Sequence, residues 1–265
     1  MNPILNSSDY EHPTDRTALA ALQSIPLLNK VLTWWLNFHV KTDMMIEYRG
    51  NGLEVTEKTC PRVWRLKQLA LDRLSIKDNI PIFITREWDY NAFATGVTTP
   101  MIVLHSGIVE DLTDDELLSI IGHEMGHIKS QHMLYHYMAR TITQWAFNNN
   151  IVSAVVMQTI IVALMEWQRK SELTADRAGF IACQNKEACI WAMMKLMGVP
   201  ENYKDSSKYE FTTDEVLKQY ENSHEDITNS AYKKLIYAYI TANISHPWTI
   251  ERIHEIEKWE GILRE

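Results

Sequence analysis

The sequence predicts an α+β fold that is mainly helical, with one small antiparallel β-sheet. Short apolar runs typical of strands occur in the first half of the chain, and from Asp114 onward nearly every segment has helical periodicity. Of the 265 residues, 46% are hydrophobic and 23% are charged. This composition is typical of a folded globular protein and excludes a disordered or fibrous chain.

Two helices, a hairpin and three strands are expected before Asp114. Residues 14–36 carry leucines at three- and four-residue steps and predict a helix, interrupted by a proline. Residues 44–56 hold a Gly-Asn-Gly sequence between apolar stretches, which predicts a hairpin. A helix is expected over 60–74, with Pro61 in its first turn. Short apolar or β-branched runs predict strands at 80–85, 91–96 and 101–105.

The most apolar stretch covers residues 151–165. A membrane-spanning helix needs about twenty apolar residues, so this shorter stretch predicts a buried helix, the alternative being a segment that dips into a membrane. The N-terminus lacks the basic region followed by an apolar region that marks a secretory signal. The three cysteines are few and odd in number, which does not fit a disulfide framework. We therefore expect a cytoplasmic protein, with peripheral membrane contact left open.

The charge argues against nucleic acid as a partner. Lys and Arg together number 26 and Asp and Glu together number 34, which gives a formal net charge of −8. The sequence also has no run of basic residues that could bind phosphates.

One short motif carries most of the functional information. His123-Glu124-Met125-Gly126-His127 has the pattern H-E-x-x-H, in a helix whose start is marked by a capping box of Thr113 and Glu116. Histidines four residues apart share one helix face and can bind one metal ion. Glu124 would lie beside that ion, where its carboxylate can accept a proton from the activated water. The alternative is a pair of surface histidines on an amphipathic helix.

A catalytic zinc site needs a third protein ligand and one open position. Glu172 and Asp176 are four residues apart, so one can bind metal while the other hydrogen-bonds to a ligand histidine. The alternative is a solvated acidic face paired with neighbouring basic residues. His132 and His136 have the same spacing, but Met133 replaces the catalytic Glu, and we expect a structural or supporting pair. Mixed imidazole and carboxylate ligands favour zinc, with manganese and cobalt as alternatives.

These motifs resemble those of the gluzincin zinc metallopeptidases of the HtpX and CAAX prenyl-protease type. The resemblance includes residues 122–127 followed by His132, the sequence Glu-Leu-Thr-Ala-Asp-Arg-Ala-Gly at 172–179, and Ser245-His246-Pro247 followed by Arg252-Ile253. Residues 91–96 are similar to the family's active-site edge strand.

The resemblance implies a zinc metalloendopeptidase with one zinc ion per chain. The ligands would be His123, His127 and Glu172, with Asp176 supporting a ligand histidine. Glu124 would be the general base in peptide-bond hydrolysis.

Two late residues are candidates to stabilise the transition state, Arg252 and His246. Arg252 has the alternative of a structural ion pair, and His246 that of an inhibitory fourth zinc ligand. The sheet would form the edge of the cleft, where an extended polypeptide substrate would add as a strand along Asn91, Ala92, Phe93 and Ala94.

The resemblance also shapes the expected domain organisation. We expect one peptidase domain over residues 1–265, with an N-terminal helical extension, 1–43, and a zinc metallopeptidase core, 44–260. The chain lacks the several long apolar spans of membrane-embedded members, which disfavours a lipidated or membrane-protein substrate. Two alternatives remain: a latent protease with a plugged site, and a peptide-holding, chaperone-like module. The intact Glu124 disfavours the second.

Overall fold

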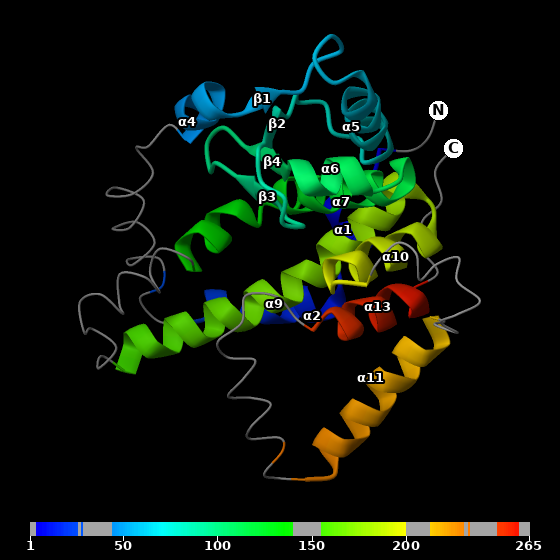
Figure 1. Ribbon diagram of the computed structural model, residues 1–265. Helices are drawn as coiled ribbons and strands as arrows, with labels where there is room; N and C mark the ends of the chain where they lie inside the picture. Colours follow the sequence, from blue (N-terminus) through cyan, green and yellow to red (C-terminus); the bar gives the residue numbers. More distant parts are fainter. Residues whose placement is uncertain are drawn as a thin grey trace.

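The computed structural model describes residues 4–25, 28, 44–139, 155–199, 213–230, 233 and 248–259. The helices among them are α1 Ser7–Tyr10, α2 Pro13–Gln23, α4 Met44–Asn51, α5 Pro61–Arg73, α6 Ser106–Asp111, α7 Asp114–Lys129, α9 Val155–Cys183, α10 Lys186–Leu196, α11 Thr213–Thr228 and α13 Thr249–Lys258. The strands are β1 Leu53–Glu54, β2 Ile82–Thr85, β3 Ala92–Thr95 and β4 Met101–His105. The mainly helical α+β class is confirmed, and Figure 1 shows the sheet on one side of α7 and α9 on the other.

The sheet is mixed, so the expectation of a wholly antiparallel sheet needs correction. The strand order is β1-β2-β4-β3, with β2 and β4 parallel and the other two pairs antiparallel. All five residues of β4 are buried, and a fully buried strand takes a central place between two neighbours. β3 is more exposed and lies at the edge of the described sheet. Gly96, at φ +87°, makes the turn that returns the chain from β3 to β4.

The hairpin predicted over residues 44–56 is wrong. Met44–Asn51 forms α4, and the short strand β1 pairs with β2 instead of with the preceding segment. Met45 is buried against Phe83 and Met101, with Tyr48 packed beside it. Because Met45 and Tyr48 are three residues apart, a helix brings both onto this contact, and the tertiary packing outweighs the local turn signal.

Two glycines allow α7 and α9 to approach closely. A Cβ at Gly122 would lie 2.3 Å from the Ala182 Cβ, and one at Gly126 would lie 2.5 Å from the Ala178 Cβ. Both separations are far below van der Waals contact, so a larger residue would push the helices apart. The close contact sets the H-E-x-x-H face of α7 against the C-terminal half of α9.

One face of the described part of the apolar stretch at 151–165 is packed against protein, whereas Val162 on the other face is exposed. Ile160 and Leu164 of α9 are fully buried, as is Trp167, and all three belong to one apolar core with Leu22 and Leu28. None of the described helices is long and apolar enough to cross a membrane. Residues 151–154 lie outside the described residues, as do residues 26–36 of the first predicted helix except Leu28.

Candidate metal centre

Helix α7 presents the two motif histidines because its start is fixed by the predicted capping box. The Thr113 hydroxyl accepts from the Glu116 backbone N–H at 3.4 Å, and the Glu116 carboxylate accepts from the Thr113 N–H at 2.9 Å. His123 and His127 lie one turn apart on the buried face of the helix. Their Nε2 atoms are 3.2 Å apart.

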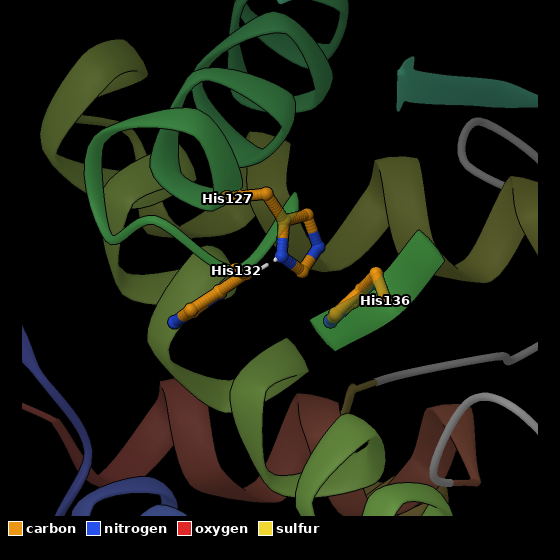
Figure 2. Close-up of side chains that lie close together, drawn as sticks. All are labelled: His127, His132 and His136. Atoms are coloured by element: carbon orange, nitrogen blue, oxygen red, sulfur yellow. Dashed lines mark hydrogen bonds between the residues drawn. The ribbon is translucent and has the colours of Figure 1, made fainter. Parts of the chain in front are cut away.

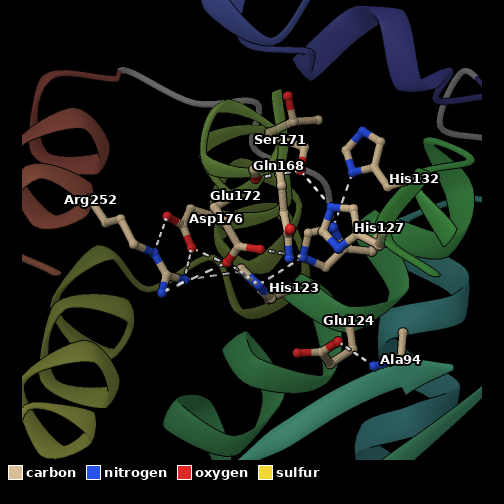
Figure 3. Close-up of polar contacts among 12 residues, drawn as sticks. Ala94, His123, Glu124, His127, His132, Gln168, Ser171, Glu172, Asp176 and Arg252 are labelled. Atoms are coloured by element: carbon tan, nitrogen blue, oxygen red, sulfur yellow. Dashed lines mark hydrogen bonds and ion pairs between the residues drawn. The ribbon is translucent and has the colours of Figure 1, made fainter. Parts of the chain in front are cut away.

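Helix α9 completes the donor set with Glu172, as Figure 3 shows. The Glu172 Oε2 atom lies 3.5 Å from His123 Nε2, and Oε1 lies 3.4 Å from His127 Nε2. Ligands held tetrahedrally at about 2.0–2.2 Å from one zinc ion would be about 3.3–3.6 Å apart. The observed separations match that spacing closely, so the residues fit a shared metal ion.

The outer nitrogen of His123 is held by a carboxylate. Asp176 Oδ1 lies 2.9 Å from His123 Nδ1, which turns Nε2 toward Glu172. Burial raises the pKa of Asp176, but the Arg252 guanidinium and the His123 ring outweigh it and lower the pKa to about 2. Burial lowers the pKa of His123, yet Asp176 and Glu172 outweigh it and raise the pKa to about 10. The site thus attracts cations strongly, and a proton and a metal ion compete for His123.

Arg252 lies behind the site, in the ion pair with Asp176. Its Nη2 and Nε atoms donate to the two Asp176 oxygens at 2.6 and 2.9 Å. Its Nη1 is 4.0 Å from Glu172 Oε2, and Nη2 is 3.4 Å from His123 Nδ1. This is the structural arrangement kept open in the sequence analysis, and a direct catalytic role for Arg252 stays a prediction.

Glu124 lies on the side of the site that faces the sheet. Its Oε2 atom accepts a hydrogen bond from the Ala94 backbone N–H at 2.7 Å (Figure 3). In the pairing of β3 with β4, the His105 N–H donates to the Asn91 carbonyl, so Ala92 and Ala94 turn their backbone groups outward. The structure therefore brings the predicted base and the predicted edge strand together.

The two other histidines singled out in the sequence, His246 and His132, have different outcomes. His246 is outside the described residues. His132 contacts the predicted ligand His127, and its Nδ1 is 3.0 Å from His127 Nδ1. Sequence reasoning missed Asp15, whose carboxylate lies 3.3 Å from His132, because a lone aspartate in α2 carries no motif.

A further group of possible ligands is better explained by hydrogen bonding. His105 lies between two carboxylates, with Nδ1 2.8 Å from Asp89 and Nε2 3.4 Å from Glu87. Because each carboxylate faces a different ring nitrogen, the two carboxylates hold the imidazole between them instead of converging with it on one ion.

The comparisons with known proteins agree with this geometry. The model of peptidase family M48 matches residues 65–260 of the chain. The chain belongs to this family. It is a zinc-dependent metallopeptidase, a hydrolase that cleaves peptide bonds, and the resemblance stated from its motifs is confirmed.

The relatives of this M48 peptidase include a plant and a bacterial protein. The chain is 27% identical over 261 residues to the plastoglobule-localized metallopeptidase 48, chloroplastic, of Arabidopsis thaliana. The match covers 98% of the chain and 74% of that protein. The chain is 28% identical over 236 residues to a protease HtpX homolog of Salinibacter ruber, covering 78% of both. No solved structure matches the chain.

Proposed function

We propose that this M48 peptidase binds one zinc ion per chain through His123, His127 and Glu172, and is an endopeptidase with Glu124 as general base. The observation that carries the ligand assignment is the convergence of the three side chains at 3.2–3.5 Å. A bound zinc ion would act as a Lewis acid that acidifies water and polarises the scissile carbonyl.

Glu124 would carry the proton in this reaction. Its carboxylate accepts a proton from the attacking water and returns it to the leaving amine. The Ala94 N–H fixes the direction of that carboxylate at 2.7 Å, so the base is held in place before substrate arrives.

The substrate would be an extended polypeptide that adds to the outer edge of β3 along Asn91–Ala94. Ala92 and Ala94 turn their backbone groups to that edge, and main-chain pairing gives affinity with little dependence on side chains. Glu124 already accepts from the Ala94 N–H, so Ala92 offers the N–H for a peptide carbonyl.

Arg252 and His246 keep two proposed roles each. Arg252 would either position Asp176 or donate to the transition state. Replacing His246 separates its roles, because His246→Ala raises basal proteolysis if the residue plugs the site and lowers it if the residue assists. The cytoplasmic location and peripheral membrane contact also stay proposals. Fractionation of cells that express the chain tests the location, and carbonate extraction of the membrane fraction tests whether any membrane contact is peripheral.

The decisive test uses Glu124→Gln and Glu172→Ala together. Glu124→Gln should abolish casein hydrolysis and retain zinc, because the amide keeps its shape but cannot accept the proton. Glu172→Ala should lose zinc, measured by elemental analysis after dialysis, because a ligand is removed. Substantial turnover by Glu124→Gln would exclude it as the base, and equal zinc in Glu172→Ala and wild type would exclude the ligand. A peptide-holding module would show no chelator-sensitive hydrolysis at all.

A further inference from the structure

A chain of buried side chains runs from the N-terminal helix to the ligand His127. The ring atoms His127 Nδ1 and His132 Nδ1 are 3.0 Å apart, and His132 Nε2 is 3.3 Å from Asp15 Oδ2. The hydroxyl of Thr174 donates to the same Asp15 oxygen at 2.6 Å. Exposure is 5% or less for all four residues, so water does not compete for these contacts.

The proton positions in this chain follow from the aspartate. Burial raises the pKa of Asp15, but the His132 ring and the Thr174 hydroxyl outweigh burial and lower it. A charged carboxylate only accepts hydrogen bonds, so a neutral His132 carries its single proton on Nε2, 3.3 Å from Asp15, and leaves Nδ1 as an acceptor. His127 must then donate from Nδ1, which leaves its Nε2 lone pair directed at Glu172 and His123.

We propose that Asp15 and His132 are positioning residues of the metal site, which together fix the tautomer and ring orientation of His127. The proposal rests on the proposed ligand set. The two ligand histidines are thus held differently: a carboxylate contacts His123 directly, whereas an imidazole lies between His127 and its carboxylate. Helix α2, expected to be an extension outside the core, contributes to the metal centre.

His136 provides a matched control within the same cluster. Figure 2 shows His132 and His136 on either side of His127, and their ring centroids lie 5.3 and 4.7 Å from that of His127. His132 hydrogen-bonds with His127 Nδ1, whereas His136 Nε2 hydrogen-bonds with the Ser171 hydroxyl at 2.7 Å. A loss of bulk near His127 affects both variants, and a loss of the hydrogen-bonded chain to Asp15 affects only one.

The first measurement is zinc affinity of the full chain, by competition with a chromophoric chelator. Asp15→Asn and His132→Asn should each weaken zinc binding about 10–100-fold. Asp15→Asn introduces an amide that can donate to His132 and so reverse the tautomers of His132 and His127. His132→Asn removes the imidazole that contacts His127. His136→Asn should bind zinc like wild type, because His136 hydrogen-bonds with Ser171 and not with the chain to Asp15. Wild-type affinity in both Asp15→Asn and His132→Asn would overturn the proposal, as would an equal loss in His136→Asn.

The second measurement needs neither zinc nor activity. Long-range ¹H–¹⁵N spectra of the imidazoles in the metal-free wild-type chain should show His132 protonated on Nε2 and His127 on Nδ1. His127 protonated on Nε2 would overturn the proposal even if the Asp15 variant failed to fold. A different pair of results would refute the proposed ligand set and leave this proposal standing. These are spectra with the expected tautomers in the wild type, together with normal zinc binding by Glu172→Ala.

Discussion

The ion pair of Arg252 and Asp176 allows the two proposed roles of Arg252, positioning Asp176 or contacting the transition state, to be separated by measurement. Asp176 is 4% exposed and receives two hydrogen bonds from Arg252. Its pKa falls from an ordinary 3.8 to about 2, and that lowering corresponds to about 2 kcal/mol of interaction with its surroundings. Arg252→Ala would leave this carboxylate buried without its cation, which costs about 3–5 kcal/mol.

A double-mutant cycle measures this coupling and decides the role of Arg252. The variants are Arg252→Ala, Asp176→Asn and both together, compared by urea unfolding in the presence of a chelator. If Arg252 acts through Asp176, the double variant is about 2 kcal/mol more stable than the sum of the single losses predicts. Its activity also falls no further than that of the more damaged single variant.

A different result would refute the positioning role. A coupling energy below about 0.5 kcal/mol, with multiplicative losses of kcat, would show that Arg252 acts on the substrate independently of Asp176. Lys218→Ala is the control, because Lys218 forms an exposed pair with Glu215 and its loss should leave the unfolding midpoint unchanged.

Two further predictions concern the edge strand and the start of α7. Ala94→Pro removes the N–H that holds Glu124 and should lower kcat about tenfold. Ala92→Pro removes only the outward N–H proposed to bind substrate and should raise KM. Identical kinetic changes in the two variants would contradict this division of roles. Burial raises the pKa of Glu116, but Lys195 at 2.7 Å and the Thr113 N–H outweigh it and lower the pKa below 4.5. Because the folded pKa is the lower one, the stabilisation by Glu116 is present above about pH 4.5 and is lost as the pH falls through the folded pKa. Urea unfolding of Glu116→Gln should therefore show a weaker dependence on pH below about 4.5 than the wild type, and an unchanged slope would refute the assignment.

Local signals predicted the starts of two helices, among them α7, which carries two of the proposed ligands. The capping box at Thr113 and Pro61 at the first turn of α5 mark helix starts through contacts within four residues, and both starts are confirmed. The H-E-x-x-H spacing needs only helix geometry to bring His123 and His127 together.

The remaining features depend on contacts between distant segments. The Gly-Asn-Gly signal failed because Met45 of α4 packs on Phe83 of β2. The central place of β4 in the sheet follows from its complete burial. Asp15 was missed for the same reason: its partner His132 lies far along the chain, and no spacing rule connects them.

The ligand assignment is tested most directly by locating the metal. Anomalous diffraction at the zinc edge from crystals of the zinc-loaded chain should give one peak per chain, about 2.0–2.2 Å from His123 Nε2, His127 Nε2 and a Glu172 oxygen. A peak among His127, His132 and His136, or a peak that Glu172 does not contact, would contradict the proposed metal centre.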